Sequence, residues 1–217
     1  PLRNWVFYYP AEKLLAHWTD VLITVNKEDY CLAVKSFRAG KVYYIPGIGI
    51  DTGHFYEKKK KKKDSDGTGW KNFCRKFQIP QDAVVLLSVG ELSRRKNHQA
   101  VIAALAGLKK KHVYYLICGQ GTLKHTLMEQ AKKLGVGRYV RLLGFLADVE
   151  ELYRNADLFV FPSLQEGMPA ALMEAMAAGL PCIASDIRGN RELIDSQGGR
   201  LFLPGQTAKI QAALREF

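Results

Sequence analysis

Apolar residues in this chain form short uninterrupted runs that alternate with stretches of helical spacing. Such runs are typical of buried strands, whereas apolar residues that recur every three or four positions indicate helices. From residue 83 onward the pattern predicts helices at 97–108, 123–134 and 148–155, the last capped by Asp148, and strands at 83–89, 113–118, 140–143, 158–161, 181–185 and 200–203. Fully apolar strands joined by helices indicate an α/β fold, with a parallel sheet covered by helices on both faces.

The first fifty residues carry a separate, shorter pattern. Helices are expected at 9–18 and 27–38 and strands at 21–25 and 42–45, before a turn at 46–49. Two β-α units are too few to bury a full α/β core. We therefore expect residues 1–50 to be the tail of a larger upstream domain. Residues 51–80 form a linker with a lysine run, in which Trp70, Phe73 and Phe77 have helical spacing, and residues 81–217 form the second domain.

Composition places the chain among globular proteins of a reducing compartment. Apolar residues make up 47% of the chain, but none of their runs is long enough to cross a bilayer. The four cysteines include no C-x-x-C pair, which disfavours a disulfide framework or a zinc site. No leader with a cleavage site is recognisable. We expect a cytoplasmic location, or a chain whose natural start has been removed.

The net charge of +11 is concentrated in one place. Six lysines form the run 58–63, and without them the charge would still be +5. This surplus suits an anionic ligand or the anionic inner face of a membrane, and it does not by itself imply nucleic acid. The run itself is either a solvated segment or a peripheral contact with lipid head groups.

Two carboxylates eight residues apart give the most informative local pattern. Glu166 lies just before a helix that opens at Pro169, and Glu174 lies inside that helix. The first amides of a helix lack intrahelical partners and can hold an anion. A nucleotide-sugar, with its sugar, diphosphate and ribose, would suit this arrangement. The alternative is a loop acid and a helix-surface acid without a special role.

Loops that follow the other expected strands carry weaker signals. Three cations, Arg94, Arg95 and Lys96, lie between a strand end at Gly90 and a helix start, where they could neutralise a diphosphate or form only a solvated basic loop. A P-loop is absent. Turns at 119–121 and 144–146 could receive a nucleotide or be simple connections. The five histidines lack metal-ligand spacing, so no protein-bound metal is expected.

Taken together, these motifs resemble the retaining glycosyltransferases of family 4, which have the GT-B fold of two facing Rossmann-like domains. The resemblance runs from about Tyr9 to Leu203, and members that make capsular polysaccharide or exopolysaccharide are most similar. Its most specific element is the pair Glu166 and Glu174, with Met-Pro-Ala between them and Ala-Met-Ala-Ala-Gly-Leu-Pro after them. It is supported by segments 88–90, 96–97, 118–121, 143–145 and 156–163, and at the domain junction by 19–20 and 45–51.

The resemblance implies a role for each matching position. Glu166 would contact the donor sugar, and Glu174 would hold the ribose. Lys96 would stabilise the leaving diphosphate, helped by amides near Gly167 and Met168. The implied catalytic residues are Glu166 and Lys96, and the implied donor-binding residues are Gly90, Arg94, Arg95, Gly119, Gly121, Gly144, Phe145, Leu146, Gly167, Met168, Ala170 and Glu174. No metal or other cofactor is implied.

One departure concerns Glu91, since many members have arginine at that position. We expect the Glu91 carboxylate to point away from a diphosphate, with Arg94 or Arg95 supplying the missing cation. The implied reaction is transfer of a hexose-type sugar, with retention, from a UDP-sugar to a polysaccharide or lipid-linked acceptor. With the upstream domain mostly absent and the C-terminus stopping early, the chain could bind a donor yet transfer little. The alternatives are a non-catalytic nucleotide-sugar-binding fragment and a sugar-nucleotide epimerase of the same architecture.

Overall fold

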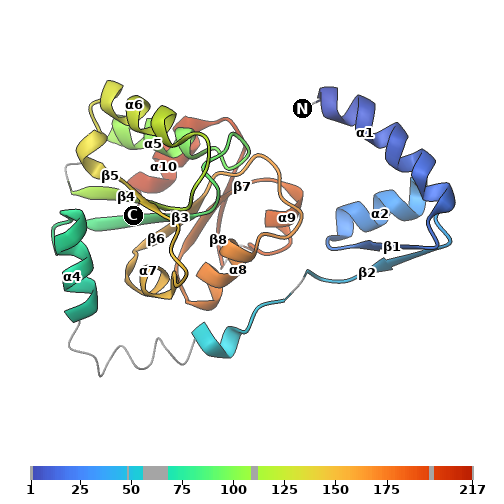
Figure 1. Ribbon diagram of the computed structural model, residues 1–217, viewed down its shortest axis with the longest axis horizontal. Coiled ribbons are helices and arrows are strands. Elements are labelled where there is room, and N and C mark those ends of the chain that lie inside the picture. Colours follow the sequence, from blue (N-terminus) through green and yellow to red (C-terminus); the bar gives the residue numbers. More distant parts are fainter. Residues whose placement is uncertain (1, 48, 56–67, 109–111, 196–197, 217) are drawn as a thin grey trace. The chain divides into compact units, whose positions relative to one another are not determined.

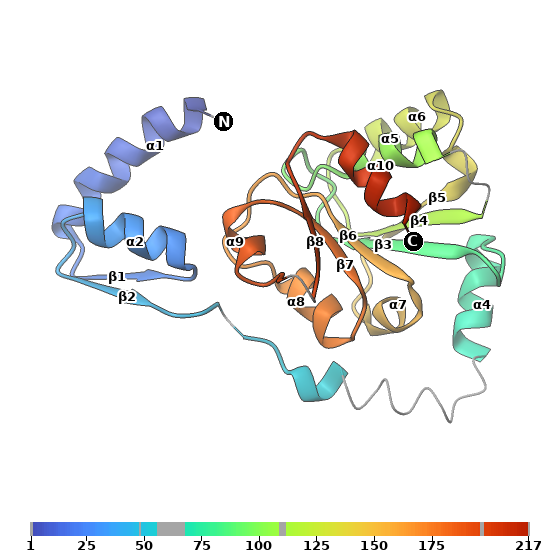
Figure 2. The ribbon, with the colours of Figure 1, turned by 180° about the vertical axis from the view of Figure 1, so that it is seen from behind.

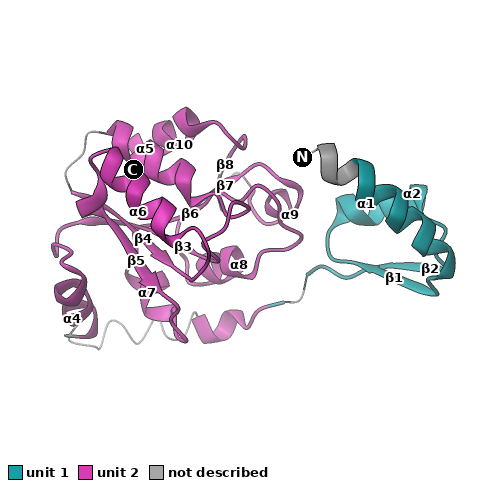
Figure 3. Ribbon diagram, turned by 45° about the horizontal axis from the view of Figure 1, so that its top comes forward, with its two compact units in different colours: residues 1–49 teal, residues 50–217 magenta. Residues whose placement is uncertain are grey.

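The computed structural model describes residues 2–47, 49–55, 68–108, 112–195 and 198–216. The chain divides into two compact units, Pro1–Gly49 and Ile50–Phe217, which Figure 3 shows in different colours. Each unit is described by itself. The lysine run at 58–63, expected as a solvated segment or a lipid contact, lies outside the described residues.

A six-stranded parallel sheet forms the centre of the larger unit, which confirms the expected α/β fold (Figure 1). Its strand order is β5-β4-β3-β6-β7-β8. The strands are β3 (Val84–Val89), β4 (Val113–Cys118), β5 (Val140–Gly144), β6 (Leu158–Phe161), β7 (Cys182–Ser185) and β8 (Gly199–Phe202). All residues of β4, β6 and β7 are buried, which explains why these strands are continuous apolar runs.

Helices cover both faces of this sheet. The views in Figures 1 and 2 place α5, α6 and α10 on one face and α7 and α8 on the other. The Arg141 guanidinium of β5 donates to the main-chain carbonyls of Phe77 and Gln78 at the end of α4, so α4 lies by that edge strand. The helices are α4 (Thr68–Phe77), α5 (His98–Leu108), α6 (Lys124–Lys133), α7 (Glu150–Asn155), α8 (Ala170–Ala177), α9 (Arg188–Arg191) and α10 (Thr207–Arg215), with a 3-10 turn η3 (Gly137–Tyr139).

The strand order reverses direction at β3, which pairs with both β4 and β6. In open parallel sheets the loops that leave two such strands lie at the same edge of the sheet, and ligands bind in a crevice beyond the carboxyl ends of the strands. The loop 90–97 leaves β3 and the loop 162–169 leaves β6. The sequence motifs with three cations and with Glu166 thus lie at the crevice.

Helix boundaries differ from the sequence expectations in several places. The helix expected at 9–18 is α1 (Leu2–Leu15), followed by the 3-10 turn η1 (Ala16–Trp18). Helix α7 begins at Glu150 rather than at 148, with Val149 in the capping position, although the Asp148 carboxylate does accept the Glu150 amide at 2.9 Å. The short helix α9 and the helix α10 were not expected. Both are anchored by few buried side chains, such as Ile210 and Leu214 of α10, too few to give a clear apolar period.

The smaller unit contains α1 (Leu2–Leu15), η1 (Ala16–Trp18), β1 (Val21–Thr24), α2 (Lys27–Ser36) and β2 (Lys41–Tyr44). Its two strands are parallel, and the Asn26 side chain caps α2 by accepting the Asp29 amide at 2.8 Å. Val21 and Ile23 of β1 and Tyr43 of β2 are each about half exposed, as is Ile45 just beyond β2. Because Ile23 pairs with Tyr43 in the strand register, these side chains share one face of the sheet.

Candidate functional site

Two loops at the reversal point of the sheet are joined by hydrogen bonds. The Leu164 amide donates to the Arg95 carbonyl at 2.8 Å, and the Asn97 side chain donates to the Pro162 carbonyl at 3.3 Å. Asn97 has a φ of +53°, in the left-handed region that asparagine adopts more readily than most residues. These contacts fix the cation-bearing loop against the loop that carries Glu166.

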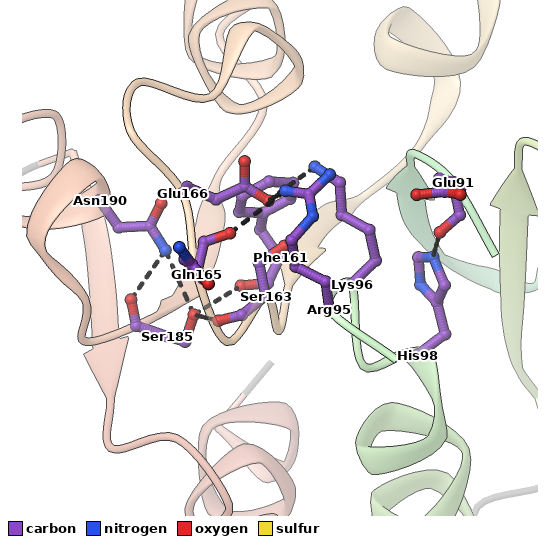
Figure 4. A network of polar contacts seen from close by, with 10 residues as sticks. All are labelled: Glu91, Arg95, Lys96, His98, Phe161, Ser163, Gln165, Glu166, Ser185 and Asn190. Carbon is purple, nitrogen blue, oxygen red and sulfur yellow. Dashed lines mark hydrogen bonds and ion pairs between the residues drawn. The ribbon is translucent and has the colours of Figure 1, made fainter. Parts of the chain in front are cut away.

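An ion cluster lies where the two loops meet (Figure 4). Lys96 Nζ is 2.7 Å and Arg95 Nη1 is 2.9 Å from the same atom, Glu166 Oε1. The Lys96 and Glu166 side chains are only 12% and 9% exposed. The ammonium group also lies 4.7 Å from the centroid of the Phe161 ring, within the range of cation–π attraction. The cluster carries two positive charges against one negative charge, so it can attract an additional anion.

A buried polar group lies behind the Glu166 loop (Figure 4). Ser185, at the end of β7, donates to the Ser163 carbonyl, and the Asn190 amide donates to the Ser185 carbonyl at 2.8 Å. A Cβ added at Gly189 would overlap the Gly167 carbonyl. The end of β6 is therefore held by β7, and α9 packs closely on the turn at Gly167.

Glycine turns on the other side of the crevice pack against the loop after β3. Gly90 has a φ of +153°, and a Cβ there would lie 3.2 Å from Lys96 Cε. A Cβ at Gly119 would meet the Gly90 carbonyl, and one at Gly121 would lie 2.7 Å from the Leu92 amide nitrogen. The turns border a pocket of about 270 Å³, which is lined by Leu92, Gly119, Gln120, Gly121, Lys124, Leu142 and Gly144. This pocket has room for part of a small ligand and has one cationic side chain at its wall.

The remaining expected site residues are more dispersed. Phe145 projects into solvent with 70% of its surface exposed, whereas Leu146 packs against the core. Met168 is half-buried, and Ala170 is the first residue of α8 after the cap at Pro169. Glu174 is not part of the ion cluster but accepts a hydrogen bond from the Tyr153 hydroxyl at 2.9 Å. The structure thus joins Arg95, Lys96 and Glu166 directly and places Glu174 in a second polar contact.

The positions of the neighbouring charged residues agree with the expectation for Glu91. Figure 4 shows the Glu91 carboxylate apart from the ion cluster, and Glu91 is exposed. Arg94 is exposed as well, and the contacts to Glu166 come from Arg95 and Lys96. The geometry therefore favours Arg95 over Arg94 as the additional cation of the site.

A family profile described as glycosyl transferases group 1 matches residues 71–217, which include the whole parallel sheet. The chain belongs to this family. The group 1 glycosyltransferase profile covers the cation loop, the glycine turns and both glutamates.

Individual relatives in the group 1 glycosyltransferase family are similar over most of the chain. EpsD of Bacillus subtilis is 37% identical over 100% of this chain and 56% of its own length. The name of EpsD describes it as a glycosyltransferase. The UDP-Gal:alpha-D-GlcNAc-diphosphoundecaprenol alpha-1,3-galactosyltransferase of Escherichia coli is 28% identical over 88% of this chain and 49% of its own length. The chain thus spans about half the length of these relatives.

The fold is similar to that of a protein whose crystal structure has been solved. The crystal structure of Alr3699/HepE from Anabaena in complex with UDP and glucose matches with a TM-score of 0.80. The match covers 96% of this chain and 56% of that chain, at 21% sequence identity. At this identity the likeness shows the shared architecture, and it agrees with the parallel sheet described above.

Two features of this group 1 glycosyltransferase were missed at the level of sequence. One is Tyr153, whose hydroxyl contacts Glu174. The other is a buried chain of polar side chains, in which His98 Nδ1 lies 3.1 Å from the Tyr115 hydroxyl and that hydroxyl lies 2.8 Å from Ser88 Oγ. Tyr115 and Ser88 occur inside apolar runs, where the pattern indicates core, and Tyr153 lies in the charged helical stretch 148–155. The sequence gives no signal for the partner of any of these side chains.

His98 links the buried polar chain to the cation loop. It is 2% exposed, and its Nε2 atom donates to the Glu91 carbonyl at a distance of 3.2 Å. The pKa of His98 is lowered from 6.5 to about 4, mainly because the imidazole is buried. The hydrogen bond to the Glu91 carbonyl raises this pKa, and the positive charge of Lys96 lowers it. The imidazole is therefore neutral near pH 7 and holds the first turn of the loop by a hydrogen bond.

This pKa predicts that the free energy of unfolding falls as the pH is lowered from 7 to 5. The unfolded state binds a proton near the ordinary pKa of histidine, whereas the folded state stays neutral until about pH 4, so acid favours unfolding. At about 1.4 kcal/mol per pKa unit, His98 would contribute a loss of about 2 kcal/mol over this interval. Urea unfolding at both pH values should show a difference that is about 2 kcal/mol smaller in His98→Gln. The exposed His125→Gln is the control, and an unchanged pH dependence in His98→Gln would contradict the assignment.

The described residues contain no group of three or more histidine, cysteine, aspartate or glutamate side chains arranged to hold a metal ion. Within the same residues, no helix is both long and apolar enough to span a membrane.

Proposed function

We propose that this chain is the donor-binding part of a retaining glycosyltransferase that transfers a hexose-type sugar from a UDP-sugar to a polysaccharide or lipid-linked acceptor. The observation that carries the proposal is the cluster of Arg95, Lys96 and Glu166 at the reversal point of the parallel sheet. Such a crevice is the usual ligand site of this architecture. Two cations facing one carboxylate leave net positive charge for a diphosphate.

The chemistry follows from where negative charge appears during transfer. As the bond between the anomeric carbon and the diphosphate breaks, the leaving oxygen gains negative charge, which the nearly buried Lys96 and the more exposed Arg95 would stabilise. The first amides of α8 would add partial positive charge at the same place. Glu166 would then contact the donor sugar, since its carboxylate lies beside the two cations.

The nucleotide would extend from the diphosphate toward the glycine turns. The pocket at 119–121 and Gly144 would receive it without interference from side chains at Gly119 and Gly121, and Phe145 would offer an exposed aromatic surface to the base. Glu174 would accept hydrogen bonds from the ribose hydroxyls. The names of relatives support this choice of ligand, since one acts on UDP-Gal with a diphosphoundecaprenol acceptor and one was crystallised with UDP and glucose.

The smaller unit would be part of the acceptor-binding domain. Its half-exposed Val21, Ile23, Tyr43 and Ile45 form an apolar sheet face that an α/β domain normally covers. The relatives are about twice as long as this chain, so the part of each relative that this chain does not match is long enough to form such a domain. A lipid-linked acceptor would place the protein in the cytoplasm, with peripheral contact to the anionic inner face of the membrane through basic residues.

Titration calorimetry of the full-length protein with UDP tests the proposal. We expect a dissociation constant on the order of 1 μM to 1 mM, the usual range of substrate affinity in enzymes, and transfer of sugar from a UDP-sugar to an added acceptor. UDP binding without transfer would indicate a non-catalytic binding module. Conversion of the donor without acceptor would indicate an epimerase, and a lack of binding to any nucleoside diphosphate would contradict the site itself.

A further inference from the structure

The hydroxyl of Tyr153 makes a hydrogen bond to Glu174 that has no role in the reaction described above. Tyr153 lies on α7 with 1% of its surface exposed, and its hydroxyl is 2.9 Å from Glu174 Oε2 on the neighbouring helix α8. Burial raises the pKa of this phenol, and the Glu174 charge raises it further. The hydroxyl therefore keeps its proton and donates a hydrogen bond to the carboxylate.

The ring of Tyr153 is held on two sides. Phe159 of β6 lies 5.7 Å away between ring centroids, and Phe55 packs on the ring nearly edge-to-face at 6.2 Å. The neighbouring His54 contacts the Glu150 carboxylate of α7, so residues 54 and 55 are fastened to the helix that carries Tyr153. Because the ring is packed against both neighbours, the position of the hydroxyl is fixed. A fixed hydrogen-bond donor in turn determines the orientation of the carboxylate that accepts from it.

We propose that Tyr153 is a positioning residue, which holds one oxygen of Glu174 so that the other faces the ribose hydroxyls of a bound nucleotide. The inference rests on the proposed function, because it assigns a partner to the carboxylate that would bind the ribose. A carboxylate on a helix surface otherwise samples several rotamers, and ordering it at binding would lower the affinity. Tyr153 removes this cost in advance.

The test compares UDP with 2′,3′-dideoxy-UDP, which lacks both ribose hydroxyls, in calorimetric titrations of the full-length protein. Wild type should bind UDP about 30-fold more tightly than the dideoxy compound, because hydrogen bonds to a carboxylate are stronger than those between neutral groups. Tyr153→Phe keeps the ring and its packing. It should weaken UDP binding about tenfold and leave binding of the dideoxy compound within about twofold.

Three comparisons separate the possible outcomes. Tyr139→Phe removes a hydroxyl from a ring that packs on Tyr114 and should change neither affinity. Glu174→Ala should abolish the preference for UDP, and Tyr153→Phe should have no further effect in that background. If Glu174→Ala keeps the full preference, the ribose role in the proposed function is wrong. If Glu174→Ala loses it while Tyr153→Phe keeps it, or if Tyr153→Phe weakens both ligands equally, the positioning role of Tyr153 is overturned and the proposed function stands.

Discussion

Replacing Lys96 with methionine in the full-length protein is expected to reduce sugar transfer about 100- to 1,000-fold, the usual effect of removing one preorganised donor to developing charge. Lys96 Nζ lies 2.7 Å from Glu166 at a site where both side chains are nearly closed to water, so water can replace the ammonium only poorly. The loss should fall mainly on kcat, because the leaving diphosphate carries more charge in the transition state than in the bound donor.

The choice of methionine separates the charge from the packing of Lys96. The aliphatic part of the side chain lies against Gly90, and its end lies over the Phe161 ring, contacts that methionine largely keeps. Lys132→Met, at an exposed position of α6, removes the same charge from the surface and is the matched control. Initial rates of transfer at saturating donor give the comparison. Turnover of the Lys96 variant within about threefold of wild type would contradict its role at the diphosphate.

The sequence pattern was sufficient to predict the parallel sheet and the meeting of its loops. Fully buried strands such as Val113–Cys118 are continuous apolar runs, so the first and last residues of each run in the sequence mark the limits of the strand. Because the carboxyl ends of parallel strands lie at one edge of the sheet, the loops after these strands were expected to share that edge, and the structure adds that β3 and β6 are neighbours. The contact of Lys96 with Glu166, 70 residues apart, follows from this topology.

The finer structure of the site depends on directions that a sequence does not contain. Arg94 and Arg95 are adjacent and chemically identical, and only the path of the loop, with Asn97 in a left-handed conformation, turns Arg95 toward Glu166. In the same way, Tyr153 appears as one more large core residue until α7 and α8 are placed side by side. Both features are set by tertiary packing, which local patterns leave undetermined.

Substituting Glu166 with glutamine is expected to change nucleotide binding and sugar transfer in opposite directions. Glu166 Oε1 accepts hydrogen bonds from both Arg95 and Lys96, so a diphosphate must compete with this carboxylate for the two cations. Glutamine has a similar shape but no charge, which leaves the cations more available. We expect UDP to bind about tenfold more tightly to Glu166→Gln, while transfer falls about 100-fold or more, because the group that contacts the sugar in the transition state has lost its charge.

Calorimetry with UDP and transfer rates from a UDP-sugar, both at one fixed salt concentration, measure the two effects on the same preparation. Glu129→Gln on α6 removes a carboxylate from an exposed position and controls for the change in net charge. A purely structural role for Glu166 would weaken both binding and transfer, since the loop after β6 would lose its attachment to the cation loop. Tighter binding together with slower transfer is therefore the combination that only a carboxylate acting at the diphosphate and the sugar would produce, and weaker UDP binding in Glu166→Gln would contradict the competition for Arg95 and Lys96.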